Sequence, residues 1–304
     1  MRILITGGAG FIPSSLAEKL LTIDAKVVLV DNFVTGKKGN IPNEVDFFEV
    51  DVNEFDEIAP IFRKHQFDYV FHFAALVGVK RTLENPLKVL DDIQGIKNIL
   101  SLANETNVNR VFYSSSSEVY GEPVHLPQHE ETTPLNSRLP YAIVKNVGES
   151  FFKSYEHTYG LKYTIFRFFN TYGPKQSPDF VMSKFINDAL QNNDITIYGD
   201  GSQTRTFCYI NDNVDACISA LLNERAVNKV YNIGNDKITT IKELAELIIK
   251  TCNSKSKIVH LPPLKDGDMT RRQPDISNMK KLLNRELIQI ESGIQLLLNE
   301  LKEE

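Results

Sequence analysis

Short apolar runs alternate with longer amphipathic segments over the first 170 residues of the chain. Several runs are apolar at consecutive positions, which is typical of strands buried between two layers of helices. After the first run, Leu16, Leu20 and Leu21 mark one helical face. Strands and helices that alternate in this way predict right-handed βαβ crossovers and a parallel, doubly wound α/β sheet. The predicted strands are residues 2–6, 26–31, 45–51, 69–74, 110–115 and 163–169.

The pattern changes after Asn170 and predicts a smaller C-terminal α/β lobe. A capping box, Thr240 with Glu243, opens an amphipathic helix that runs through Ile249. The other elements predicted there are helices near 180–191, 212–222 and 292–301, and strands 195–198 and 229–233. We therefore expect two domains, the first comprising residues 1–170 with 206–225 returning to it, and the second comprising 171–205 and 226–304.

Composition narrows the class of protein. The chain carries 34 Lys and Arg against 39 Asp and Glu, a net charge of −5, which argues against a broad nucleic-acid surface. No apolar run approaches the ~20 residues of a membrane span, and the start becomes glycine-rich too early for a signal peptide. The cysteines, Cys208, Cys217 and Cys252, are too few and too widely spaced for a disulfide framework or a zinc site. We expect a cytoplasmic protein without a metal, nucleic-acid or membrane partner.

The first predicted strand runs directly into a glycine-rich turn. Gly7 permits a tight turn, and Gly10 lets the backbone approach a pyrophosphate at a helix N-terminus. Pro13 occupies the third position of the motif, where it fits the first helical turn but removes one N–H donor. A glycine turn without a ligand is the alternative, and the strand before and the helix after it favour a dinucleotide site.

Asp31 at the end of the second strand supports that interpretation. A carboxylate there hydrogen-bonds ribose hydroxyls and repels a 2′-phosphate, which favours NAD over NADP. Lys37 and Lys38 lie close behind and weaken the preference. Asp51, which closes the third predicted strand, is a candidate for contact with the adenine, although an ordinary strand-end aspartate is an equally good explanation.

A serine-rich run ends the fifth strand, and Tyr141 and Lys145 follow it at a spacing that makes them neighbours on one helical face. The lysine ammonium stabilises a phenolate and so lowers the tyrosine pKa from ~10. The tyrosine then becomes a base able to take a proton from a sugar hydroxyl while hydride leaves the same carbon. A surface helix pair is the alternative for two such residues alone. Their combination with the serines and the glycine turn favours catalysis.

These motifs together resemble the extended short-chain dehydrogenase/reductases, which include nucleotide-sugar epimerases, dehydratases and decarboxylases. The resemblance covers nearly the whole chain. It implies a Rossmann domain that binds NAD, a C-terminal lobe that binds a UDP-sugar or another nucleotide sugar, and a reaction begun by oxidation at the sugar C4. The matching segments are Gly7-x-x-Gly10, Asp31-Asn32-Phe33, His72-Phe73-Ala74-Ala75, Ser116 with Val119-Tyr120-Gly121, Tyr141-x-x-x-Lys145, and 167–174.

The resemblance also implies roles for individual residues. The catalytic residues would be Ser116, Tyr141 and Lys145, with Ser117 and Glu118 beside them. NAD would be held, in addition to Tyr141 and Lys145, by Gly7, Gly10, Phe11, Ile12, Asp31, Asn32, Asp51, Val52, Phe73, Ala74 and Ala75. The nucleotide sugar would be held by Val79, Asn170, Arg205 and Arg272.

The member of the family is less clear, because Ser117 and Glu118 resemble an acid–base pair of dehydratases and decarboxylases. A glutamate can remove the C5 proton or assist loss of a carboxylate, but it can also bind the cofactor or loop backbone. The segments 198–207 and 267–276 resemble decarboxylases, whereas 75–86 resembles epimerases. A 4-epimerase is our leading hypothesis because it asks least of the site. The alternatives are a 4,6- or 5,6-type dehydratase, a UDP-glucuronate decarboxylase, and a catalytically silent NAD-binding regulatory protein.

Asp92 departs from the family, which usually has asparagine there near the catalytic centre. A carboxylate at that position would raise the tyrosine pKa by like-charge repulsion, unless it is simply a harmless aspartate on a helix face.

The resemblance further implies a homodimer, in which the helices after Asn85 and Pro140 pair with their copies in a four-helix bundle. The apolar residues of these helices can alternatively pack on the sheet. They include Leu87, Leu90, Ile96, Ile99, Val144 and Val147.

Overall fold

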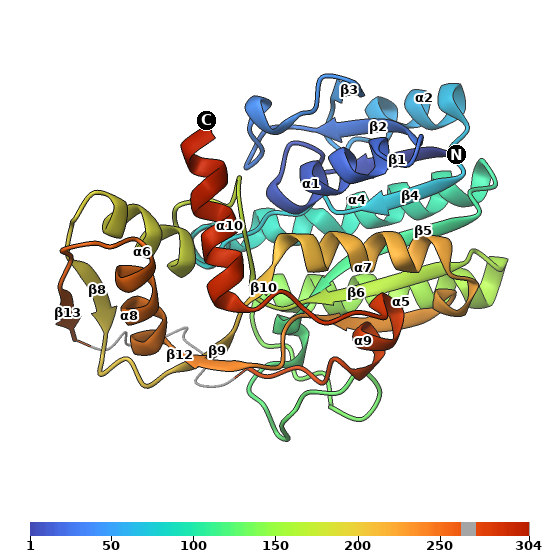
Figure 1. The fold of residues 1–304 in the computed structure, drawn as a ribbon. Helices are drawn as coiled ribbons and strands as arrows, with labels where there is room; N and C mark the ends of the chain where they lie inside the picture. Colours follow the sequence, from blue (N-terminus) through green and yellow to red (C-terminus); the bar gives the residue numbers. More distant parts are fainter. Residues whose placement is uncertain (263–271, 304) are drawn as a thin grey trace. The chain divides into compact units, whose positions relative to one another are not determined.

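A computed structural model describes residues 1–262 and 272–303 of the chain (Figure 1). The chain folds into two compact units. Unit 1 comprises Met1–Gly121, Leu135–Phe168 and Val214–Tyr231, and unit 2 comprises Glu122–Pro134, Phe169–Asn213 and Asn232–Glu304. The returning segment is therefore 214–231 rather than 206–225, and residues 122–134 leave unit 1, which the sequence pattern does not reveal.

A seven-stranded sheet forms the framework of unit 1, as the alternating pattern predicts. Its strand order is β11-β6-β5-β4-β1-β2-β3. Strands β1 to β3 follow one another toward one side of the sheet and β4 to β6 toward the other, so the strand order reverses between β1 and β4. In such sheets, ligands bind beyond the carboxyl ends of the strands at this reversal. The strands are β1 (Arg2–Thr6), β2 (Lys26–Asp31), β3 (Asp46–Glu49), β4 (Tyr69–His72), β5 (Arg110–Ser116), β6 (Tyr163–Phe168) and β11 (Lys229–Ile233).

Helices cover both faces of this sheet, so its strands are apolar on both sides. Val70 and Val111 belong to a core formed with α2, α4 and α5, whereas Phe71 and Phe112, the next residues along the strands, stack on each other at 4.2 Å on the opposite face. Figure 1 shows α1 and α7 on the nearer face. The helices are α1 (Phe11–Leu21), α2 (Phe55–His65), α3 (Val79–Glu84), α4 (Pro86–Glu105), α5 (Pro140–Tyr159) and α7 (Ile210–Leu222).

Three strands are shorter than their apolar runs suggest, and one of them, β6, ends one residue early at Phe168. The expectation that β4 reaches Ala74 is wrong because the hydroxyl of Thr6 accepts the N–H groups of Phe73 (3.1 Å) and Ala74 (3.0 Å), which therefore turn away from the ladder. The third strand covers 46–49 instead of 45–51. Asp51 lies beyond it, and its N–H donates to Glu57 Oε2 at 2.8 Å.

In its described residues, unit 2 contains three separate two-stranded pairings and its own helices. The predicted capping box is confirmed, since the Thr240 hydroxyl accepts the Glu243 N–H at 3.1 Å and the Glu243 carboxylate accepts the Thr240 N–H at 2.8 Å. Strands β7 (Thr171–Tyr172) with β10 (Cys208–Tyr209) and β8 (Ile195–Tyr198) with β13 (Ile258–Leu261) are parallel, and β9 (Thr204–Thr206) with β12 (Ile238–Thr240) is antiparallel. The helices are α6 (Val181–Leu190), α8 (Ile241–Thr251), α9 (Ser277–Leu283) and α10 (Ile290–Glu303).

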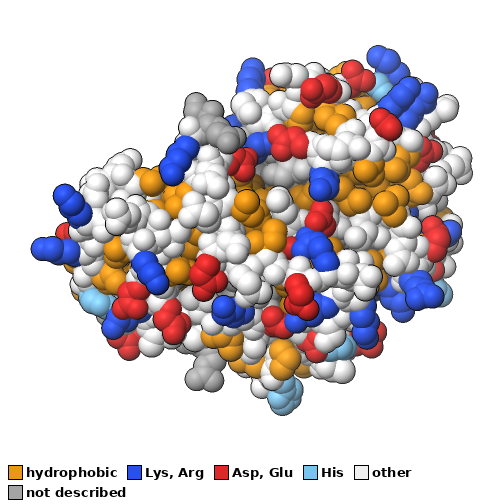
Figure 2. All heavy atoms as spheres, viewed as in Figure 1, with side chains coloured by type: hydrophobic (Ala, Val, Ile, Leu, Met, Phe, Trp, Pro, Cys, Tyr) orange, Lys and Arg blue, Asp and Glu red, His pale blue; other side chains and the backbone are white. Residues whose placement is uncertain are grey.

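Acidic and basic side chains are interspersed with apolar ones on the face shown in Figure 2. Within residues 1–262 and 272–303, no helix has both the length and the apolar character needed to cross a membrane.

Candidate active site

The glycine-rich turn joins β1 to α1 at the carboxyl edge of the sheet. Gly7 has φ +70°, and a Cβ there would lie 2.9 Å from the Ala74 backbone, so only glycine fits. Gly10, which precedes α1, brings no capping side chain. The N–H groups of Phe11 and Ile12 therefore meet no capping side chain at the positive end of the helix, a position that favours a phosphate. Pro13 lies in the first helical turn, as expected.

Asp31 ties this turn to the end of β2. Its two carboxylate oxygens accept the N–H groups of Ala9 (3.0 Å) and Phe33 (2.7 Å). Burial raises the pKa of Asp31, and these backbone N–H groups oppose the rise by stabilising the ionised form. A carboxylate offers about four lone-pair sites, so Asp31 can still accept a ribose hydroxyl. The turn, the helix start and Asp31 thus fit an NAD molecule.

The other residues predicted to hold NAD lie in the segments that follow β2, β3 and β4. The Asn32 amide donates to Asp51 at 2.9 Å, and the carbonyl of Val52 accepts a hydrogen bond from Asn98 at 3.0 Å. Phe73 and Ala74 are held by Thr6, and Ala75, the next residue, is half-buried.

The predicted catalytic residues come from the end of β5 and the start of α5. Ser116 is the last residue of β5, and its hydroxyl accepts the Glu118 N–H at 3.2 Å, which opens the 3₁₀ turn η2 (Ser117–Tyr120). Lys145 lies one helical turn after Tyr141, with its ammonium 5.7 Å from the centre of the tyrosine ring. It also donates to Ser114 Oγ at 3.3 Å. This bond links the lysine directly to the serine-rich end of β5.

Lys145 is only 3% exposed, and burial lowers its pKa to about 8. The ammonium lies 5.1 Å from the centre of the Tyr113 ring, a favourable cation–π distance. His72 is also buried, and desolvation, followed by the charge of Lys145, lowers its pKa to about 3. The histidine is therefore neutral near pH 7, and its Nδ1 pairs with the Thr6 hydroxyl at 2.9 Å.

A buried ion pair lies next to the predicted catalytic residues. Arg167 on β6 and Glu149 on α5 form two hydrogen bonds of 2.8 and 2.7 Å. Ser115 donates to the same carboxylate at 2.6 Å, and Arg167 donates to the hydroxyl of Tyr120 at 2.9 Å. The pair therefore joins β5, β6, α5 and η2. The sequence pattern does not reveal this pair, although Arg167 begins a recognised motif and Glu149 lies one helical turn after Lys145.

The helix α5 also approaches β5 very closely. A Cβ on Gly148 would overlap the hydroxyl of Tyr113. The Tyr113 ring is packed against Phe152, with the ring centres 4.7 Å apart. Burial raises the pKa of Tyr113, and the charges of neighbouring groups, including Glu149 and Asp92, raise it further. Tyr113 therefore stays protonated near pH 7 and belongs to the core between α5 and β5.

Most of the predicted sugar-binding residues belong to unit 2. The Asn170 amide donates to the Thr206 carbonyl at 3.2 Å, and half-buried Arg205 lies in the same strand, β9, where its guanidinium donates to the Thr204 carbonyl at 2.8 Å. Arg272 is half-buried. Val79 begins α3 in unit 1, and its side chain lies outside the described part, as do residues 267–271 of the predicted motif.

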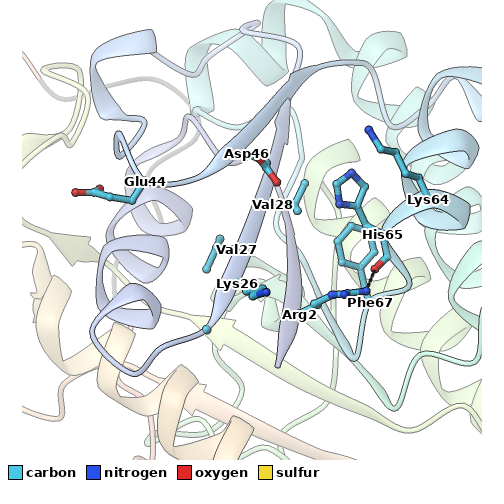
Figure 3. Close-up of a pocket in the computed structure, with 10 residues that line it drawn as sticks. Arg2, Lys26, Val27, Val28, Glu44, Asp46, Lys64, His65 and Phe67 are labelled. Atoms are coloured by element: carbon cyan, nitrogen blue, oxygen red, sulfur yellow. Dashed lines mark hydrogen bonds between the residues drawn. The ribbon is translucent and has the colours of Figure 1, made fainter.

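A pocket of about 420 Å³ lies at the opposite edge of the sheet, around the first residues of β1, β2 and β3 (Figure 3). Arg2, Lys26 and Asp46 begin these strands, and Lys64 and His65 come from the end of α2. None of the predicted site residues lines this pocket.

Comparison with known proteins identifies the class. Residues 3–234 match the model of the NAD dependent epimerase/dehydratase family. The chain therefore belongs to this family and is an NAD-dependent enzyme.

Individual relatives cover almost the whole chain. A Methanocaldococcus jannaschii protein, described provisionally as a UDP-glucose 4-epimerase, is 36% identical over 99% of this chain and 98% of its own. The UDP-N-acetyl-alpha-D-glucosaminuronate decarboxylase of Bacillus cytotoxicus is 38% identical over 92% of this chain and 91% of its own. The crystal structure of Thermotoga maritima UDP-glucose 4-epimerase with UDP-glucose matches 100% of this chain and 99% of its own, with a TM-score of 0.95 and 32% identity.

Proposed function

We propose that the protein is a 4-epimerase of a UDP-sugar. The observation that carries the proposal is the match of the entire chain to the Thermotoga maritima UDP-glucose 4-epimerase, at a TM-score of 0.95. The site supports it, since Lys145 contacts Tyr141 and the serine-rich end of β5. A 4-epimerase needs these groups and no additional acid or base.

The residues divide the work at the sugar C4. NAD, when bound, supplies reversible hydrogen acceptance at that carbon. Tyr141 takes the proton of the C4 hydroxyl and later returns it, while the charge of Lys145 stabilises the phenolate. Ser116 donates a hydrogen bond to the same substrate oxygen. Because the pKa of Lys145 is about 8, the lysine is largely protonated at pH 7, as this role requires.

The nucleotide part of the substrate belongs to unit 2 in this proposal. Arg205 and Arg272 carry the positive charge that a diphosphate needs, and Asn170 offers an amide donor. A guanidinium makes paired hydrogen bonds to phosphate oxygens, so each arginine suits this ligand better than a lysine would.

A decarboxylase is the second candidate, favoured by the Bacillus cytotoxicus relative and by Glu118. Glu118 is the second residue of η2, and its N–H donates to the Ser116 hydroxyl. A carboxylate there would act after C4 oxidation, when the neighbouring carbon or carboxyl group becomes reactive.

The test incubates the protein with a panel of UDP-hexoses, UDP-N-acetylhexosamines and UDP-glucuronate in D₂O. NMR then identifies the product formed from each. Inversion at C4 with every carbon-bound hydrogen retained supports the epimerase. Solvent deuterium at C5 indicates a dehydratase, and carbon dioxide from UDP-glucuronate indicates a decarboxylase.

The variant Glu118→Gln sharpens this result, because glutamine keeps the size of the side chain but cannot take a proton. An epimerase should lose less than about tenfold in kcat, against the ~10²–10⁴ of a lost general base. Accumulation of NADH and a 4-keto sugar in the variant would contradict the epimerase.

We also propose that the protein is a homodimer that pairs through α4 and α5. Leu87 is 77% exposed, and Leu90 and Ile143 are each 40% exposed, on two helices that pack against each other. Ile96, Ile99 and Val144 lie in the core of unit 1 and take no part in the proposed interface.

Sedimentation should give a dimer at micromolar concentration, and Leu87→Glu with Leu90→Glu should shift it to monomer. A wild-type monomer would overturn the proposal.

A further inference from the structure

Residues 33–40, which come shortly after β2, lie against the glycine-rich turn. Two donors of this segment, the N–H of Lys37 at 3.0 Å and the side-chain amide of Asn40 at 2.9 Å, meet the same acceptor, the carbonyl oxygen of Ala9. The short 3₁₀ turn η1 (Lys38–Asn40) brings the two donors together, since the Asn40 N–H donates back to the Lys37 carbonyl at 3.0 Å. A carbonyl oxygen has two lone pairs, so both bonds can form at once.

The same segment approaches the turn very closely. A Cβ on Gly36 would lie 2.9 Å from both carboxylate oxygens of Asp31 and 2.7 Å from the Cβ of Ala9. Any side chain at this position would therefore push the segment away from the turn. The hydrogen bonds to Ala9 thus belong to a direct packing contact between residues 33–40 and the turn.

Ala9 is fully buried, and residues outside the turn bind both of its backbone polar groups. Its N–H donates to Asp31 at 3.0 Å, and its carbonyl accepts the two donors described above. The Ala9 carbonyl shares a planar peptide unit with the N–H of Gly10, which donates to the Gly7 carbonyl at 2.9 Å. The direction of the Ala9 carbonyl therefore fixes the peptide that leads into α1, at the helix end that favours a phosphate.

We propose that Asn40 is a positioning residue for the cofactor: its amide holds the Ala9 carbonyl, and with it the glycine-rich turn, in the conformation that accepts the pyrophosphate before NAD arrives. The proposal rests on the binding of NAD at this turn, and it does not require Asn40 to touch the cofactor. A turn that is already ordered loses less conformational freedom on binding, which raises affinity. Without the amide, the turn should occupy the binding conformation for a smaller fraction of the time, and the apparent Kd should rise in proportion.

Two variants of Asn40 remove the donor in different ways. Asn40→Ala deletes the amide and leaves the Lys37 N–H in place. Asn40→Asp keeps the size of the side chain, but an ionised carboxylate has no hydrogen to donate to the Ala9 carbonyl. The matched controls are Asn43→Ala and Asn43→Asp, because Asn43 is exposed and its side chain makes no hydrogen bond with any residue that the structure describes. The two aspartate variants separate the lost donor from the added charge.

The primary measurement is calorimetric titration with NAD, on protein freed of bound nucleotide and without substrate. We expect the Kd for NAD to rise by about three- to tenfold in Asn40→Ala, the size of one lost hydrogen bond, and at least as much in Asn40→Asp. Both Asn43 variants should stay within about twofold of wild type, because they leave the Ala9 carbonyl untouched. An unchanged Kd in Asn40→Ala overturns the proposal.

Hydrogen exchange, followed by mass spectrometry, provides the second measurement. The amides of residues 8–11 should exchange faster in NAD-free Asn40→Ala than in wild type, and saturating NAD should remove most of the difference. A merely structural role would instead lower the free energy of unfolding in urea and speed exchange throughout unit 1, with the NAD affinity of the folded protein unchanged. That result would overturn the proposal. Because neither measurement needs a substrate, both report on Asn40 even if the reaction is not epimerisation.

Discussion

The charged side chains at the two edges of the seven-stranded sheet differ in how far they are exposed to solvent. At the amino edge, Arg2, Lys26 and Lys64 are exposed around a pocket of about 420 Å³. At the carboxyl edge, Lys145 and Glu149 are only 3% and 1% exposed. Exposed charges change the free energy of folding little. Buried charges need specific partners and have shifted pKa values. One charge at the amino edge is buried as well, that of Arg110, but it donates to the carbonyls of Ala220 and Leu221 at the end of α7. In this sheet, buried titratable side chains in mutual contact, and not the volume of a pocket, favour the carboxyl edge as the place of the chemistry.

The largest effect at the carboxyl edge should come from removing the predicted base. Tyr141→Phe keeps the ring beside Lys145 but cannot exchange a proton, so turnover should fall by roughly 10²–10⁴. The appearance of NADH absorbance on mixing with substrate should be lost as well. Lasting NADH formation in this variant would remove Tyr141 from the catalytic role.

The buried ion pair should matter next, through stability. Arg167→Met removes the buried partner of the Glu149 carboxylate and leaves it only half-exposed Lys153, whose ammonium lies 3.9 Å away. This loss should lower the free energy of unfolding by about 3–5 kcal/mol. Urea denaturation at pH 7 measures this change. The double variant Arg167→Met with Glu149→Leu should recover much of the loss, because the unpaired charge is gone. Equal instability of both variants would contradict this explanation.

Asp31 should produce a smaller effect, on cofactor choice. Asp31→Ala should reduce the preference for NAD(H) over NADP(H) by about tenfold or more, because repulsion of a 2′-phosphate is lost and Lys37 and Lys38 can then act on it. Calorimetric titration with both cofactors measures the ratio. Asp31→Asn is the matched control, since it keeps one oxygen acceptor for the glycine turn. Equal affinity of the wild-type protein for the two cofactors would refute the role.

The amino edge should show the smallest effect. Lys26→Gln and Lys64→Gln change exposed charges far from the catalytic residues in the sheet, so kcat and KM should stay within about twofold of wild type. A loss of tenfold in either variant would mean that the pocket in Figure 3 has a function that the contrast between the edges misses.

The sequence predicts the parts of this molecule that depend on local pattern. The strands β1, β2, β8 and β11 begin and end where their apolar runs do, and the capping box of α8 is present. The glycine turn and the spacing of Tyr141 and Lys145 are equally local. All of these need only neighbours along the chain.

Pairings across the fold could not be read in the same way. The end of β4 depends on a hydroxyl 67 residues away, that of Thr6. Asp31 was predicted to meet a ribose, but its bond to Ala9 requires the curvature of the completed turn. Glu149 resembles any charged residue of an amphipathic helix until β6 brings Arg167 beside it. Burial of Lys145, which sets its pKa, is likewise a property of the whole unit.

The absence of a side chain at Gly148 has a consequence for how α5 is located along its own axis. The space beside the Tyr113 hydroxyl admits a hydrogen atom but no carbon. If α5 slid by one residue, either Val147 or Glu149 would have to occupy that space, and neither fits. Gly148 therefore fixes the position of α5 along its axis, because only a glycine can face the Tyr113 hydroxyl. Tyr141 and Lys145 lie on the same helix and are held at the same axial position, and Lys145 also contacts the Tyr113 ring.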